Sequence, residues 1–176
     1  MRTMARRPFA APVHDCNTRR MSKQSTATVT AADVSTLLHA GGEMATYFDR
    51  AYAGVWQQPH VPATTLELCR LRLARLHEVA AEIESPAVTP VDAHKRAAVL
   101  AGSYARDNRV SPAERAAIEF CEVYAMDAQA ITDELAAAVV EHVGEPGLVA
   151  LIEALGFIDG RMRLARMLGP LFQGAN

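Results

Sequence analysis

The stretch from Leu66 to Ser85, LELCRLRLARLHEVAAEIES, decides the fold class of this chain. It is built mainly from Leu, Ala, Glu and Arg, which are strong helix formers. At about 100° per residue, one broad face of the predicted helix is apolar and most of its acidic residues lie roughly opposite. Thr64 is a candidate N-cap with Glu67 as its capping-box partner, and Pro86 should end the helix. The apolar face consists of Leu66, Cys69, Leu73, Leu76, Ala80 and Ile83.

The composition of the whole chain supports the same fold class. Its 176 residues suit one domain, 50% of them are hydrophobic, and Ala dominates many runs. The nine prolines and ten glycines fall mostly between periodic segments. We therefore expect an all-α protein in which residues 29–176 form a single helical bundle of about six or seven helices.

Helix-start and helix-stop signals divide the bundle at regular intervals. The expected elements are a short helix from Thr30 interrupted at Gly41-Gly42, a helix over 43–57, a loop at Pro59 and Pro62, and a helix over 64–85. They continue with a helix capped by Thr89 with Pro90 at N1, one capped by Ser111 with Glu114, one from Thr132 to Gly144, and one over 145–168. The last helix has possible bends at Gly156 or Gly160 and should close at Gly169-Pro170.

Residues 1–28 differ from the rest of the chain. The first 23 residues hold five Arg and one Lys against one Asp, without the apolar core of a secretory signal. This segment is expected to be a disordered basic tail, or to precede a true start at Met21. Targeting or an anionic partner are the alternatives.

Charge and cysteine content exclude several classes of protein. The net charge of −2 and the pI near 6.3 give no case for nucleic-acid binding. No continuous apolar run approaches the ~18 residues that span a membrane. The three cysteines, Cys16, Cys69 and Cys121, form no close pair, so a reducing, cytoplasmic location is expected.

The 66–85 stretch resembles the signature helix of the carboxymuconolactone decarboxylase and alkyl hydroperoxidase D-like family, E-x11-C-x-x-C-x-x-x-H. Glu67 occupies the Glu position, Val79 and Glu82 occupy the two Cys positions, and Pro86 occupies the His position. The order of three later motifs strengthens the resemblance, which covers about residues 43–169. They are SPAER at 111–115, ITDEL at 131–135 and RLARMLG at 163–169.

The resemblance implies an all-α fold that assembles into homo-oligomers, often trimers or hexamers, with pockets beside the signature helix. A redox-active dithiol needs a low-pKa thiolate and a second Cys one turn away, and Val79 and Glu82 supply neither. Dithiol peroxidase activity is therefore not expected. The family's decarboxylases work without a dithiol or a metal, so acid/base chemistry without a cofactor stays open.

Three residues are candidates for that chemistry. By the resemblance Glu67 is a general base or proton relay, although its side chain could instead serve the helix cap. Glu82 could be an acid/base group in a former Cys position, or a solvated carboxylate paired with Arg. His77 could act as acid, base or ligand, or be inert. A metal site is not expected, because His77 and Glu82 would point about 140° apart on one helix.

Three further residues are candidates for substrate binding. Val79 stands at the first former Cys position. Arg70, in a run with Arg72 and Arg75, could clamp a substrate carboxylate or form intrahelical or intersubunit ion pairs. Tyr52 belongs to an aromatic group that could line a pocket or form core or oligomer contacts. That group is Tyr47, Phe48, Tyr52 and Trp56.

The function expected from these features is a homo-oligomeric enzyme that acts on a small organic molecule by decarboxylation, isomerisation or a related lyase step. The alternative is a non-catalytic ligand-binding or scaffold oligomer. A redox sensor that uses Cys69 or Cys121 is a third hypothesis, although Cys121 lies on an apolar stripe typical of a core thiol.

Overall fold

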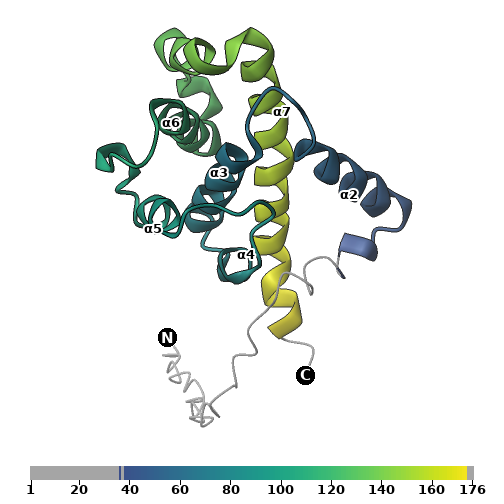
Figure 1. The fold of residues 1–176 in the computed structure, drawn as a ribbon. Coiled ribbons are helices and arrows are strands. Elements are labelled where there is room, and N and C mark those ends of the chain that lie inside the picture. The colour runs from purple at the N-terminus through teal and green to yellow at the C-terminus, as the bar shows by residue number, and fades with distance from the viewer. Residues whose placement is uncertain (1–35, 37, 174–176) are drawn as a thin grey trace, which may run out of the picture.

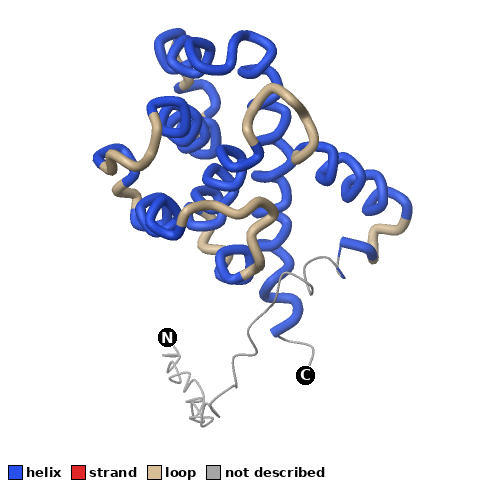
Figure 2. Tube along the Cα trace, viewed as in Figure 1, coloured by secondary structure: helices blue, strands red, loops and turns tan. Residues whose placement is uncertain are grey.

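A computed structural model describes residue 36 and residues 38–173, and all regular structure in them is helical, with no strand (Figures 1 and 2). This confirms the all-α prediction. The expected tail over 1–28 and the helix start at Thr30 lie outside the described residues. The α-helices are α2 (Glu43–Val55), α3 (Ala63–Leu76), α4 (Ala80–Glu84), α5 (Ala93–Ala101), α6 (Pro112–Met126) and α7 (Asp133–Gln173). The short 3-10 helices are η1 (Tyr104–Arg106) and η2 (Ala128–Ala130).

Helix α3 lies at the centre of the molecule, packed against α4, α5, α6 and α7 (Figure 1). Every residue from Thr65 to Leu71 is buried, including Glu67 and Arg70. The sequence pattern predicted an apolar face with most acidic residues opposite it, and in the first two turns of the helix both faces are buried. A helix surrounded on all sides buries its polar residues too, so these must find partners inside the protein.

The predicted single helix over 64–85 is divided in two. Glu78 adopts the left-handed conformation with φ of 55°. The Val79 amide donates to the Ala74 carbonyl at 2.9 Å, and the Glu78 amide donates to the Arg75 carbonyl at 3.2 Å. This pair of bonds forms a Schellman C-cap, which ends α3 and lets the short helix α4 start in a new direction.

Two of the predicted helix caps were also wrong. Helix α3 begins at Ala63, after Pro62, and no side chain caps it, so Thr64 and Glu67 form no capping box. Helix α5 is capped by Asp92 and not by Thr89. The Asp92 carboxylate accepts from the amides of His94 and Lys95 and satisfies two donors at the start of the helix.

The predicted capping box of α6 is confirmed. The Glu114 amide donates to the Ser111 hydroxyl at 3.2 Å, and the Ser111 amide donates to the Glu114 carboxylate at 2.8 Å. Pro112 occupies the start of the helix, where its missing amide hydrogen does no harm.

Helix α7 is the longest helix and runs along the other helices of the molecule (Figure 1). The predicted break at Gly144 is confirmed. Gly144 has φ of 71° and ψ of 173°, backbone angles that glycine adopts without a steric penalty. Neither Gly156 nor Gly160 interrupts the helix. The prediction that Gly169-Pro170 closes it was wrong, because α7 continues to Gln173.

By length and composition, Asp133–Leu168 is apolar enough to cross a membrane, with a mean hydropathy of 1.5 in its most apolar window. Only 22% of that window is buried within the single chain. Core helices pass the same criteria, so this is weak evidence for a membrane span, but it does show that α7 leaves apolar surface exposed.

Candidate functional site

A buried ion pair between Glu67 and Arg70 forms the centre of the site. Arg70 Nε donates to Glu67 Oε2 at 2.9 Å, and Arg70 Nη2 donates to Glu67 Oε1 at 2.8 Å. Glu67 is 0% exposed and Arg70 is 1% exposed. Burial alone would lower the pKa of Arg70, but the hydrogen bond and the charge of Glu67 outweigh it and raise that pKa. The ion pair confirms one of the expectations for Arg70, an intrahelical partner.

Glu82 on α4 extends the pair into a network. Arg70 Nη1 donates to the Glu82 backbone carbonyl at 2.8 Å and lies 3.3 Å from its carboxylate atom Oε2. The other carboxylate oxygen, Oε1, accepts from Arg161 Nε on α7 at 2.9 Å. Two carboxylates and two guanidiniums therefore alternate in charge across three helices, as burial of charges requires.

The turn between α3 and α4 explains why Glu82 reaches Arg70. On one continuous helix these residues would be about 18 Å apart along the axis. The left-handed Glu78 redirects the chain, so that Glu82 returns to the side of α3. The alternative of a solvated Glu82 was therefore wrong, whereas the pairing with arginine that it included is confirmed.

Tyr52 on α2 lies beside the network. The guanidinium carbon of Arg161 lies 5.3 Å from the centre of the Tyr52 ring, a cation–π contact. Burial raises the pKa of Tyr52 to about 12, although the positive charge of Arg161 acts in the opposite direction. The phenol is therefore a neutral hydrogen-bond donor at physiological pH. Tyr52 is half-buried and the Arg161 side chain is 12% exposed, so these two residues form the more accessible edge of the network.

The aromatic residues of α2 form a cluster around Tyr52. Its ring stacks on Phe48 at 6.2 Å and meets Trp56 edge-on at 5.9 Å. Phe48 also contacts Phe157 of α7 at 5.9 Å. Tyr47 points away and is 59% exposed. The cluster holds α2 against α7 and fixes the position of the Tyr52 ring.

His77 does not join this network. It ends α3, and its Nε2 lies 2.5 Å from Asp159 Oδ1 on α7. The other Asp159 oxygen accepts from Arg163 Nε at 2.5 Å. Asp159 and Arg161 are two residues apart, about 200° around α7, so His77 and Glu82 meet different sides of that helix.

Val79 and the other arginines of α3 have structural positions. Val79 is buried in the hydrophobic core at the start of α4. Arg72 pairs with Glu122 on α6, so this partner belongs to another helix. Arg75 is exposed. In the described part of the chain, neither Arg72 nor Arg75 forms a hydrogen bond or an ion pair with a member of the Glu67 network.

The two cysteines in the described part of the chain are buried thiols. Cys69 and Cys121 are both 0% exposed, which confirms the prediction that Cys121 is a core residue. Burial, followed by the neighbouring Cys69, raises the pKa of the Cys121 thiol. A redox sensor needs an accessible thiol with a lowered pKa, and Cys121 has the opposite properties. Cys16 lies outside the described residues.

Two pockets of about 200 Å³ each open on the described surface. One lies beside the start of α3, and the other lies between α2 and α7. Neither is lined by Glu67, Arg70, Glu82 or Arg161. Within residues 36 and 38–173, no three His, Cys, Asp or Glu side chains gather in a metal-binding group.

The fold and the site define an all-α protein with a charge-balanced buried network at its central helix. No protein-family model, no curated protein and no solved structure matches the chain. The family resemblance therefore rests on the sequence motifs alone.

Sequence reasoning identified Glu67, Arg70, Glu82 and Tyr52, which the structure brings together. It missed the roles of Arg161 and Asp159. Arg161 and Asp159 both lie well inside α7. Arg161 and Glu82 are 79 positions apart in the sequence, and no local sequence pattern indicates a contact over that separation.

Proposed function

We propose that this protein is a small-molecule enzyme of the alkyl hydroperoxidase D-like fold that performs acid/base chemistry without thiols. The reaction would be a decarboxylation, an isomerisation or a related lyase step, without a cofactor and in the cytoplasm. Glu82 would transfer the proton, Tyr52 and Arg161 would contact the substrate, and Glu67 and Arg70 would position Glu82.

The single observation that carries this proposal is the convergence of four charges beside the central helix, three of them buried (Glu67, Arg70 and Glu82) and one half-buried (Arg161). Desolvation of two ion pairs often exceeds their mutual attraction, and apolar residues of similar volume would commonly give a fold at least as stable. A charge network of this kind, beside a tyrosine whose pKa is raised to about 12 by burial, supports a functional role for the site.

The accessibility of the two carboxylates favours Glu82 over Glu67 as the proton-transfer group. Both oxygens of Glu67 are held by Arg70 inside the core. Glu82 Oε1 faces Arg161, the member of the network nearest to solvent. A substrate carboxylate or enolate could compete for Arg161 and release Glu82 Oε1 to accept a proton from carbon. Glu67 then acts through Arg70, as a positioning residue.

The test is exchange of carbon-bound hydrogen for solvent deuterium, followed by proton NMR in a panel of small oxo acids and lactones. Wild-type protein should catalyse exchange next to a carbonyl in at least one compound, and Glu82→Gln should lower that rate by about 10²-fold or more. Glu84→Gln is the matched control, because Glu84 is an exposed carboxylate on the same short helix. Its rate should equal that of wild type.

Wild-type exchange retained in a folded Glu82→Gln variant would overturn the role of Glu82. Native mass spectrometry of protein from cell extract gives an independent starting point. A co-purified organic acid would add the natural substrate class to the panel.

The second candidate is a non-catalytic ligand-binding or scaffold protein. The complete pairing of Glu67 with Arg70 favours it, because a carboxylate held by two hydrogen bonds can have a purely structural role. A protein without bound small molecules and without exchange activity on any compound of the panel would support this candidate.

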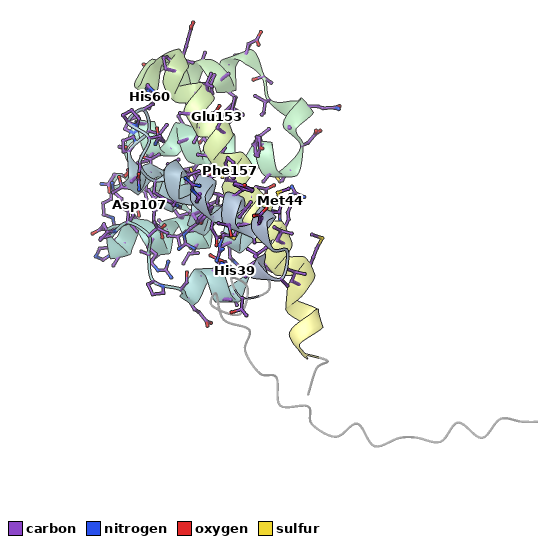
Figure 3. All side chains as sticks on the ribbon, turned by 90° about the vertical axis from the view of Figure 1, so that its right-hand side faces the viewer. His39, Met44, His60, Asp107, Glu153 and Phe157 are labelled. Carbon is purple, nitrogen blue, oxygen red and sulfur yellow. The ribbon has the colours of Figure 1, made fainter. Side chains whose placement is uncertain are left out.

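Assembly into a trimer or hexamer belongs to the same proposal. It rests on the family resemblance and on exposed apolar residues of α2 and α7. Figure 3 views this side of the molecule, with Met44, Glu153 and Phe157 labelled along it. Met44 is 73% exposed and Val149 is 55% exposed.

A further inference from the structure

The pocket beside the start of α3 lies outside the Glu67 network and is formed by four segments of the chain. They are the loop before α3, the first turn of α3, the first two turns of α6, and α7 around its kink. Thr65 lines this pocket and is two residues from Glu67, about 200° around α3, so the two side chains face different directions. The lining residues are His60, Val61, Pro62, Thr65, Ala113, Ala117, Val139, His142, Val143 and Leu151.

The kink of α7 shapes one wall of this pocket. Gly144 interrupts the helix, and the side chain of the preceding Val143 turns back over Gly147. A Cβ at Gly147 would lie 2.5 Å from Val143 Cβ and 3.6 Å from the His60 carbonyl oxygen. The chain therefore has glycine at the point where Val143, α7 and the α2–α3 loop approach each other most closely.

The volume and the apolar walls of the pocket limit the size and polarity of the main part of a ligand. Its volume is about 200 Å³, and seven of its ten lining residues are Val, Ala, Leu or Pro. An apolar cavity of about 150 Å³ is large enough for benzene. One ring with a short substituent therefore fits this space, whereas a fused-ring molecule or a nucleotide does not.

The polar groups that line the pocket indicate which polar group a ligand would carry. His60 and His142 are exposed and line the pocket from the α2–α3 loop and from the first part of α7 (His60 is labelled in Figure 3). Imidazole N–H groups donate hydrogen bonds to carboxylates. Thr65, which is only 5% exposed, adds a hydroxyl group to the lining of the pocket. The start of α3 carries the partial positive charge of a helix N-terminus and has no side-chain cap.

We propose that this pocket binds a small carboxylate with a single ring, with the ring between Ala113, Val139 and Leu151 and the carboxylate between His60 and His142. The site is separate from the Glu67 network. No residue of the network lines it. The proposal does not depend on the proposed enzymatic function.

The probe for the test is 4-fluorobenzoate, observed by fluorine NMR while it is titrated with the full-length protein. We expect saturable binding in the micromolar to millimolar range. Ala113→Phe fills the pocket and should weaken binding at least tenfold. The matched control is Ala137→Phe, the same change at an exposed position of α7 that does not line the pocket. It should bind the probe as wild type does.

The two histidines are tested with a second probe. Replacing both, His60→Gln with His142→Gln, should weaken 4-fluorobenzoate binding at least fivefold and leave the neutral 4-fluorotoluene bound as before. His94→Gln, an exposed histidine on α5, is the control. If Ala113→Phe does not fold, these substitutions of surface histidines still test the proposed site.

Three results would overturn the proposal. They are no saturable binding of either probe, undiminished binding in a folded Ala113→Phe variant, and equal losses in the variants and their controls. Undiminished binding of 4-fluorobenzoate in the double histidine variant would overturn the carboxylate assignment and leave an apolar site, and equal losses for the two probes would overturn it as well.

Discussion

The Arg70 side chain joins α3 to α4 directly and to α7 through Glu82. Its Nε and Nη2 bind the Glu67 carboxylate on its own helix, and its Nη1 binds the Glu82 carbonyl of α4. Through Glu82 it is connected to Arg161 on α7. Because Glu67, Arg70 and Glu82 are buried, loss of Arg70 leaves carboxylates without their partner in a region that water does not reach.

This arrangement predicts a large effect for one substitution. Arg70→Met should lower the free energy of unfolding by about 3–5 kcal/mol, since Glu67 is left as an uncompensated buried charge. The measurement is urea unfolding followed by circular dichroism. Arg166→Met is the control, because the Arg166–Glu78 pair is on the surface, where such pairs contribute about 0–1 kcal/mol.

A double variant separates the ion pair from simple loss of packing. Glu67→Leu combined with Arg70→Met removes both charges, so it should unfold at a higher urea concentration than Arg70→Met alone. If the double variant were the less stable of the two, packing and the Glu82 contacts would dominate the role of Arg70.

The residue types that bear chemistry and the intrahelical pairing of Arg70 could be predicted from the sequence, but the contacts between helices could not. Glu67, Arg70 and Glu82 all lie within one short stretch, and the family pattern drew attention to two of them. Their burial was not foreseen, because a helical wheel assumes one solvated face. The contacts with Arg161 depend on tertiary packing, which leaves no local signal in the sequence.

At the scale of single elements, the capping box of α6 also carries an ion pair between helices. Lys95 Nζ on α5 lies 2.7 Å and 2.8 Å from the two oxygens of Glu114, which also accepts from the Ser111 amide. Burial alone would raise the pKa of Glu114, but Lys95 and Ser111 outweigh it and lower that pKa.

The lowered pKa of Glu114 predicts a pH dependence of stability. A carboxyl whose pKa is lower in the folded state stabilises the fold above its unfolded value of about 4.5, and this stabilisation is lost as the pH falls below that value. Glu114→Gln should therefore destabilise the protein by about 1 kcal/mol at pH 7 and have little effect near pH 3. Urea unfolding across this range is the measurement. A difference that stays constant with pH would contradict the ion-pair explanation.

The kink of α7 predicts opposite effects for two glycine substitutions. Gly144→Ala places a Cβ at φ of 71° and should destabilise the protein by about 1–3 kcal/mol. Gly160 lies in regular helix, and a Cβ there meets no atom within 4 Å. Gly160→Ala should therefore stabilise the protein by about 0.5–1 kcal/mol. Thermal unfolding of both variants checks this pair, and a stabilising Gly144→Ala would mean that the kink is not required.

Helix boundaries could be predicted from the sequence where a common capping residue or a glycine marks them. Ser111 with Glu114, Thr132, and Gly144 each mark a boundary that the structure has. The end of α3 was not predictable, because Glu78 takes a left-handed conformation that sequences normally assign to Gly or Asn. That single unusual residue also decides the site, since it returns Glu82 to Arg70.

At the scale of the whole molecule, α7 combines two different surfaces. Its inner side meets α2, α3 and α6. Its outer side exposes Val149 and Ile152, and α2 exposes Met44 and Tyr47. Several large apolar residues exposed together are typical of an interface. The all-α character could be read from composition, but the position of this surface required the packing of α2 on α7.

The last prediction concerns the oligomeric state. If α2 and α7 form the contact between copies, native mass spectrometry and light scattering should show a trimer or a hexamer. Val149→Lys with Ile152→Lys should then shift the protein to smaller species, because two lysines in an apolar interface must lose their hydration. Met126→Lys is the control, since Met126 is 71% exposed at the end of α6. A monomeric wild-type protein would contradict the assembly, and an intact oligomer in the double lysine variant would place the interface elsewhere.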